Sequence, residues 1–86
     1  MDADTLPPYP LEVAREIFPP IWVIYERPAD FPGGYVVRVW YGLTPETYGH
    51  GCGTLEDARR YARACGACVP MDRADTDPPS VLEAWL

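Results

Sequence analysis

Two stretches in the first half of the chain alternate between opposite faces, as β-strands do. In residues 21–27 (IWVIYER), Trp22 and Ile24 fall on one face and Val23 and Tyr25 on the other. Residues 35–41 (YVVRVWY) repeat this alternation, with large apolar groups on both faces. The connection 28–34 contains two prolines and a Gly pair, which are typical of turns. We therefore predict a β-hairpin with a longer loop.

One stretch in the second half has helical spacing. Its apolar stripe consists of Leu55, Ala58, Ala62 and Cys65, with Tyr61 beside it. Thr54 is a good N-cap residue, and Gly66 is the residue expected to end the helix. The spacing turns Arg59, Arg60 and Arg63 toward solvent and lets Glu56 pair with Arg60 one turn later. This is the main helix that the sequence predicts.

The remaining elements are shorter. Residues 11–18 could form two helical turns that end at a Pro pair, and residues 42–53 form a Gly-rich loop. Residues 67–71 are predicted as a strand in which Pro70 favours an edge position, and residues 80–86 as a final strand. The predicted fold class is α+β in the order (α)ββαββ, with the main helix packed on a small, mostly antiparallel sheet. We predict that residues 1–20 are an N-terminal arm that could contain the short helix and that residues 21–86 are a single α+β domain.

Charge narrows the class of partner. The chain has 86 residues, with 13 acidic residues against 7 basic ones, and its net charge is -6. A protein that binds DNA or RNA directly needs clustered Lys and Arg, whereas here every basic residue is a scattered arginine. An acidic surface suits a basic protein patch, although the same charge also serves solubility.

The sequence also predicts a soluble, cytoplasmic protein. No segment approaches the roughly 18 consecutive apolar residues of a membrane span. The first ten residues, MDADTLPPYP, lack the basic and apolar regions of a signal peptide. The chain has three cysteines, an odd number that cannot all pair in disulfides. This agrees with a reducing compartment.

The cysteines and the single histidine leave several interpretations open. His50, Cys52, Cys65 and Cys68 form two closely spaced pairs, as in a structural zinc site, but one intervening residue between His50 and Cys52 is tight. The favoured interpretation is that Cys65 and Cys68 are ordinary core residues and that His50 is an exposed loop residue. A redox role for Cys65 is disfavoured because it lies at the C-terminal end of the helix. We therefore predict no metal site and no cofactor.

The sequence does not predict an enzyme. His50 could pair with a cysteine as base and nucleophile, but nothing positions a third group beside them. A Gly-flanked loop is also a poor platform for catalysis. A small enzyme of unknown reaction stays an alternative, as does a zinc-stabilised adaptor domain.

Three stretches resemble a family of short, uncharacterised proteins from proteobacteria and their phages. They are WVIYERPADFPGGYVVRVW (22–40), TLEDAR (54–59) and VPMDRADTDPPSVLEAWL (69–86). They carry the pattern Trp-x-[Val/Ile]-Tyr-x-x-Pro-x-Asp-Phe-Pro and a closing Glu-x-Trp-aliphatic strand, and they span about half the chain. The resemblance implies a compact α+β fold and a mobile-element context. This chain has CGAC where the family has an aliphatic run with proline, which counts against a metal site common to the family.

These observations favour a small acidic inhibitor, for example an anti-CRISPR protein. It would block a basic surface of a larger host protein or ribonucleoprotein through carboxylates, with aromatic side chains as anchors. The predicted partner-binding residues are Asp72, Asp75, Asp77, Asp30 and Tyr25. The two-faced strand 35–41 and the edge near Pro70 could also support a homodimer.

Overall fold

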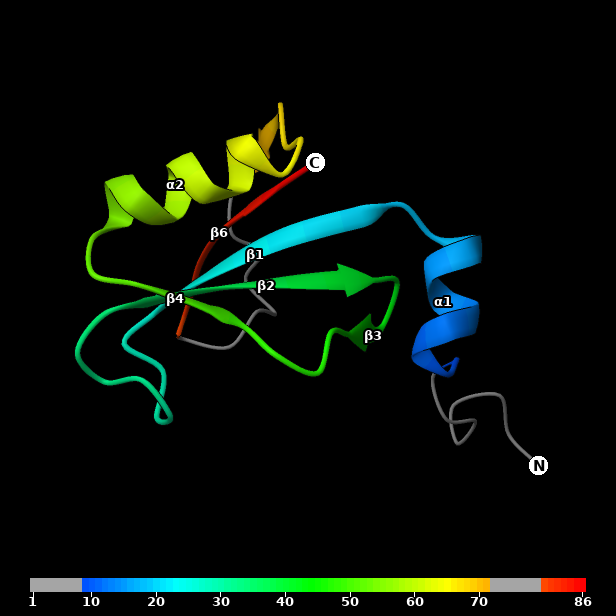
Figure 1. Cartoon of the computed structure of the whole chain (residues 1–86), viewed down its shortest axis with the longest axis horizontal. Helices are drawn as coiled ribbons and strands as arrows, with labels where there is room; N and C mark the ends of the chain where they lie inside the picture. The colour runs from blue at the N-terminus through cyan, green and yellow to red at the C-terminus, as the bar shows by residue number, and fades with distance from the viewer. Residues whose placement is uncertain (1–8, 72–79) are drawn as a thin grey trace.

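The computed structural model describes residues 9–71 and 80–86. This part of the chain is an α+β fold with two helices and one antiparallel sheet. The elements in chain order are α1 (Leu11–Ile17), β1 (Pro20–Glu26), β2 (Tyr35–Tyr41), β3 (Thr44–Pro45), β4 (His50–Cys52), α2 (Leu55–Ala64), β5 (Pro70–Met71) and β6 (Val81–Trp85). In Figure 1, α2 lies over one part of the sheet and α1 lies beside its other end.

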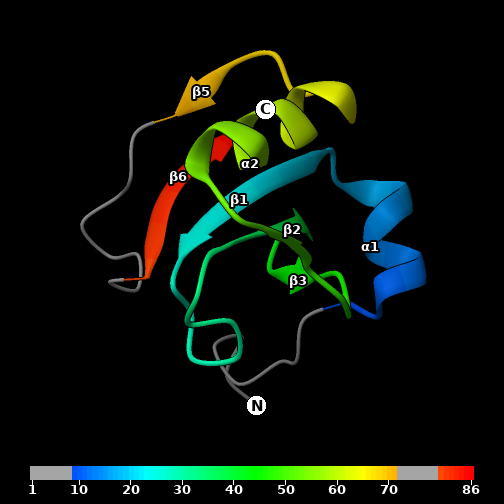
Figure 2. The same cartoon turned by 60° about the vertical axis from the view of Figure 1, so that its left-hand side comes forward.

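The β1–β2 hairpin is the centre of the sheet and confirms the predicted pair of strands. The strands pair antiparallel from Pro20 opposite Tyr41 to Glu26 opposite Tyr35. The strand order is β3-β2-β1-β6-β5, and β4 pairs with β2 beside β3. The last strand, β6, therefore lies next to β1, as Figure 2 shows.

The hydrophobic core lies between this sheet and α2. Trp22 and Ile24 of β1 point toward α2 together with Val37 of β2, and Ile24 is completely buried. Trp85 of β6 is directly opposite Trp22 in the register and is buried with it. Ala58 and Ala62 form the buried stripe of α2, and their small side chains let the helix approach the sheet closely.

Both ends of α2 are capped as predicted. The Thr54 hydroxyl accepts a hydrogen bond from the Asp57 backbone N–H at 3.1 Å. At the other end, the N–H groups of Gly66 and Ala67 bond to the carbonyls of Arg63 and Ala62, both at 3.0 Å. This is a Schellman motif, and the φ of +114° at Gly66 explains why glycine ends the helix.

The charged face of α2 differs from the prediction. Arg59 does not point into solvent but forms two hydrogen bonds with Glu83 of β6. Glu56 lies near Arg63 at 3.8 Å rather than pairing with Arg60, whose guanidinium lies 3.6 Å from Asp57. The difference at Arg59 arises because β6 brings a half-buried carboxylate against the side of the helix.

The sequence predicts only a loop for the Gly-rich segment 42–53, and this prediction is wrong in part. It contains β3 and β4, which both pair with β2. In β4, His50 and Cys52 alternate with glycines, and Gly51 is opposite Val36. A Cβ at Gly51 would lie 3.1 Å from the Phe31 ring, and one at Gly49 would clash with the Val36 side chain. Glycine therefore lets this strand pack closely over Phe31 and Val36.

The edges of the sheet are short. β5 has two residues rather than the predicted 67–71, and it lies at the edge, as Pro70 indicated. Val69 and Leu86 extend its pairing with β6 through backbone hydrogen bonds of 3.0 and 2.8 Å. On the other side, α1 packs against β2 and β3, and its Ala14 is completely buried.

Candidate functional site

Within residues 9–71 and 80–86, a hollow lies on each face of the sheet. The first, here called the Tyr25 hollow, has a volume of about 190 Å³. Its lining residues are Tyr25, Pro28, Asp30, Val36, Arg38 and Ser80. Ile24 of β1 and its cross-strand partner Val37 of β2 point toward α2. Tyr25 and its partner Val36 are the next residues of each strand toward the hairpin loop, and neighbouring residues in a strand point to opposite faces, so this hollow is on the face away from α2.

The Tyr25 side chain is held in place by a cross-strand contact. Trp40 of β2 donates its indole N–H to the Tyr25 hydroxyl at 2.9 Å, so the phenol ring is fixed against the sheet. Arg38 also lines the hollow, and its Nε is buried without a hydrogen-bond acceptor in the part of the chain that the structure describes. The hollow thus combines an aromatic ring, a carboxylate and an arginine.

Two of the five predicted partner-binding residues meet at this hollow. Tyr25 comes from β1 and Asp30 from the loop that follows it. Asp72, Asp75 and Asp77 lie outside the described residues. Ser80 is the first described residue after that acidic segment, and its carbonyl accepts a hydrogen bond of 2.7 Å from the Glu26 N–H. Ser80 therefore lines the same hollow as Tyr25 and Asp30.

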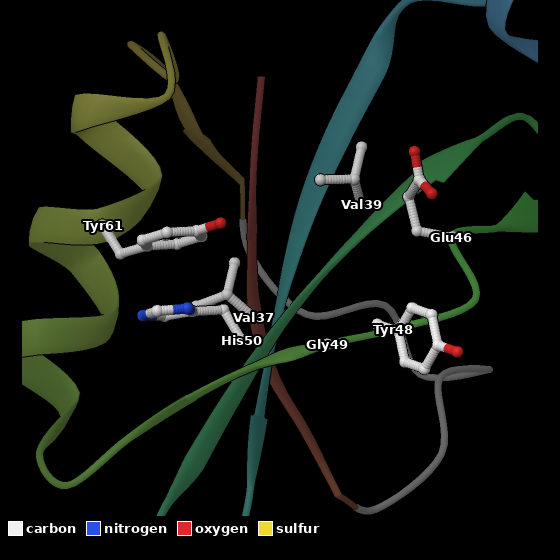
Figure 3. A pocket seen from close by; sticks show the side chains of 7 residues that line it. All are labelled: Val37, Val39, Glu46, Tyr48, Gly49, His50 and Tyr61. Carbon is white, nitrogen blue, oxygen red and sulfur yellow. The ribbon is translucent and has the colours of Figure 1, made fainter.

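The second hollow, here called the Tyr61 hollow, has a volume of about 340 Å³ and lies on the face that carries α2. Figure 3 shows its lining side chains, which are Val37, Val39, Glu46, Tyr48, Gly49, His50 and Tyr61. The two valines of β2 form an apolar floor. His50 and Tyr61 stand on one side of this floor, and Glu46 and Tyr48 stand on the other (Figure 3).

The His50 ring stacks on the Tyr61 ring. Their centroids are 3.8 Å apart and the planes differ by 5°. The register explains the contact, because His50 is opposite Val37 and therefore points toward α2, where Tyr61 lies. His50 is exposed, as predicted, but it belongs to strand β4 rather than to a loop. Burial, followed by a hydrogen bond with the Cys65 thiol, raises the pKa of the Tyr61 hydroxyl.

Glu46 on the opposite side of the hollow is paired with α1. Arg15 reaches it with Nε at 3.1 Å and with Nη2 at 2.8 Å from both carboxylate oxygens. The Glu46 backbone N–H also donates a hydrogen bond to the Val39 carbonyl at 2.8 Å, so the start of the connection between β3 and β4 (46–49) is fixed on β2. Tyr48, two residues later, is 86% exposed and packs little against the rest of the protein.

The four residues considered as zinc ligands do not converge. Cys52 is buried in the core, and burial raises the pKa of its thiol. Cys65 and Cys68 are both exposed, so their predicted core positions are wrong. The reason is the helix end, because the Schellman turn places Ala67 in the core between them. No group of three or more His, Cys, Asp or Glu side chains within residues 9–71 and 80–86 could hold a metal ion.

Sequence reasoning did not identify Glu46, Tyr48 and Tyr61 as neighbours. A signal was present, because YGHGCG (48–53) places Tyr48, His50 and Cys52 at alternate positions, the period of a strand. The glycines between them hid this pattern, since glycine is unfavourable in strands. Only the pairing of β4 with β2 shows which side chains then face α2.

Comparison with protein-family models, with curated proteins and with solved structures found no match for this chain. The described residues form an α+β fold with a hollow on each face of the sheet. In the part that the structure describes, no helix is long and apolar enough to span a membrane.

Proposed function

We propose that this protein is a small acidic inhibitor of phage or mobile-element origin. It acts in the host cytoplasm by blocking a basic surface of a larger protein or ribonucleoprotein, such as a CRISPR complex. The observation that carries this proposal is the meeting of Tyr25 and Asp30 at one hollow, which Ser80 also lines. Arg38 also lines this hollow with a buried Nε, so a partner's arginine or lysine would contact the exposed Asp30 carboxylate and the anchored Tyr25 ring at its rim.

The distribution of charge supports the same interpretation. Among the arginines within residues 9–71 and 80–86, four are paired with carboxylates of the protein itself: Arg15 with Glu46, Arg59 with Glu83, Arg60 with Asp57 and Arg63 with Glu56. These pairs neutralise much of the positive charge, so the excess negative charge falls on the other acidic residues. Such a surface attracts basic partners over a distance and accelerates their encounter. It also disfavours direct binding to nucleic acid.

Asp30 and Tyr25 would act differently in the complex. The exposed Asp30 carboxylate would pair with a basic side chain at the rim of the contact. The half-buried Tyr25 ring, which is already fixed by Trp40, would supply apolar area at little entropic cost. The carboxylates of Asp72, Asp75 and Asp77 would extend the acidic surface.

A plasmid-interference assay tests the inhibitory role. Cells that carry an active CRISPR system and express this protein should retain a targeted plasmid that control cells lose. The purified protein should bind the corresponding effector ribonucleoprotein, and raising the salt concentration from 0.05 to 0.5 M (about a threefold reduction of the Debye length) should weaken binding at least tenfold. Normal plasmid loss across a panel of effector types, together with no binding, would contradict the proposal.

Variants test the proposed surface. Asp30→Asn and the triple change of Asp72, Asp75 and Asp77 to Asn should each weaken binding, by about two- to fivefold for each carboxylate. Glu16→Gln on α1 removes the same charge elsewhere on the exposed surface and should have little effect. If it weakens binding as much as Asp30→Asn does, net charge and not this surface is responsible.

A further inference from the structure

The Tyr61 hollow has the composition of a site for an organic cation. It joins an apolar floor, tyrosine rings and a carboxylate, and it is not part of the surface proposed above. Aromatic faces attract cations through the negative potential of the ring, and a nearby carboxylate supplies the opposite charge. The net charge of -6 raises the local concentration of such ligands.

The structure already shows which cation Glu46 accepts. The guanidinium of Arg15 approaches both carboxylate oxygens through Nε and Nη2, at 2.8–3.1 Å. A guanidinium provides several donors in one plane, whereas an ammonium group is a single point of charge. The Glu46 carboxylate is therefore oriented to accept hydrogen bonds from the coplanar N–H donors of a guanidinium group.

The Arg15–Glu46 pair is also easy to exchange. The Arg15 side chain is 50% exposed and that of Glu46 is 23% exposed. Water can solvate the half-exposed Arg15 guanidinium when it leaves, and a second guanidinium that takes its place keeps the Glu46 carboxylate paired. Arg15 can thus leave Glu46 for solvent when a second guanidinium enters the hollow.

The aromatic residues provide the other contacts. Tyr48 is 86% exposed at the rim, where its free ring face can stack on a guanidinium plane. The Tyr61 ring is held by its stack with His50 and points its hydroxyl toward the floor of the hollow (Figure 3). Val37 and Val39 can pack against the aliphatic part of an arginine side chain.

We propose that the Tyr61 hollow binds the guanidinium group of an arginine side chain from a partner protein, with Glu46 exchanging Arg15 for it. This inference relies on the proposed function only for the presence of a basic partner. Arg15 occupies the carboxylate in the free protein and is a competitor of the partner's arginine. The hollow then adds a specific arginine contact to the general attraction of the acidic surface.

Titration with short capped peptides tests the hollow by itself. The probe is acetyl-Gly-Arg-Gly-amide, and chemical-shift changes of the ¹⁵N-labelled full chain report its binding. Shifts should be concentrated at Glu46, Tyr48, His50 and Tyr61, in the millimolar range of concentration. The same peptide with lysine should bind at least twofold more weakly, and the neutral citrulline peptide should bind at least fivefold more weakly. Equal binding of all three peptides, or shifts spread over the whole surface, would overturn the proposal.

Replacing Arg15 distinguishes an exchange of guanidinium groups at Glu46 from general electrostatic attraction of the peptide. Arg15→Gln should tighten binding of the arginine peptide about two- to fivefold, because the competing guanidinium is gone. Arg60→Gln changes the net charge equally on α2 and should change binding less than twofold. Glu46→Gln should abolish detectable binding, and Glu16→Gln should not. If Arg15→Gln and Arg60→Gln behave alike, Arg15 does not compete and the proposal is wrong.

The aromatic contribution is tested by Tyr48→Ala, which removes a side chain that packs little and should leave the fold intact. It should weaken binding of the arginine peptide about threefold or more. Unchanged binding would contradict the predicted role of the ring. These measurements do not depend on the plasmid-interference assay. Peptide binding without plasmid protection would contradict only the proposed function, and plasmid protection without peptide binding would contradict only the proposal for the Tyr61 hollow.

Discussion

Arg59 of α2 and Glu83 of β6 are joined by two hydrogen bonds, with Nε 2.8 Å from Oε1 and Nη2 3.0 Å from Oε2. The carboxylate also accepts a hydrogen bond from the Trp85 indole at 3.1 Å. The hydrogen bond from Arg59 is the main reason that the pKa of Glu83 is lowered in the folded protein, against the opposing effect of burial. This pair therefore connects the helix to the last strand.

Replacing Glu83 with Gln should destabilise the protein by about 1–2 kcal/mol at pH 7. Because folding lowers the pKa of Glu83 below its ordinary value of 4.5, its contribution is complete above that pH. It is lost as the pH falls through the lower folded-state pKa. Urea unfolding followed by tryptophan fluorescence should show a large difference between the two proteins at pH 7 and a small one at pH 2.

A control for this prediction is Glu56→Gln, which removes a long, exposed contact of 3.8 Å with Arg63. It should change the free energy of unfolding by less than about 0.5 kcal/mol. If the Glu83→Gln variant loses the same stability at both pH values, its effect comes from packing and not from the ionised carboxylate.

Gly66→Ala should destabilise the protein by about 1 kcal/mol or more, because the φ of +114° is unfavourable for any residue with a Cβ. Gly53→Ala is a matched control, since both positions have open space for a Cβ but Gly53 has no positive φ. It should be neutral or stabilising by up to about 1 kcal/mol. Thermal unfolding of the two variants measures the difference, and equal midpoints would contradict the role of Gly66 in the helix end.

Thr54→Ala should cost about 0.5–2 kcal/mol, because the Asp57 N–H loses its acceptor at the start of α2. Thr54→Ser keeps a hydroxyl in the same place and should retain most of the stability. Far-UV circular dichroism during urea unfolding reports the loss of helix directly. The prediction is wrong if the Ala and Ser variants unfold at the same urea concentration.

The three thiols should differ in their reaction with iodoacetamide under native conditions. Cys65 and Cys68 are exposed and should be alkylated readily, whereas Cys52 is 8% exposed and should react only after unfolding. Burial also raises the pKa of Cys52 and lowers the fraction of reactive thiolate. Trypsin separates Cys52 from the other two cysteines, so mass spectrometry can score each group. Rapid native labelling of Cys52 would contradict its place in the core.

The sequence predicted the elements that carry their own local signal. The β1–β2 hairpin and α2 were identified because alternation, helical spacing, the Thr54 cap and Gly66 all act within a few residues. β4 was missed because a strand that alternates with glycine has little β-propensity of its own and is stabilised by its pairing with β2. Cys65 was misplaced because helical periodicity puts it on the inner face, whereas the Schellman turn brings Ala67 into the core instead.

The candidate sites depend even more on long-range pairing. Tyr25 and Asp30 are five residues apart, so their meeting could be anticipated from the sequence. The stack of His50 on Tyr61 requires the β4–β2 register and the position of α2 together. The approach of Arg15 to Glu46 joins residues 31 positions apart. No local pattern determines such contacts.

The position of β6 beside β1 affects how the chain folds during synthesis. The ribosome releases β1 and β2 early, and these strands can pair as a hairpin at once. The other edge of β1 stays unpaired until Val81–Trp85 emerge, because its partner strand lies more than half the chain away. In a nascent chain that edge can recruit a foreign strand, so the arrival of β6 both completes the sheet and ends the period of greatest aggregation risk.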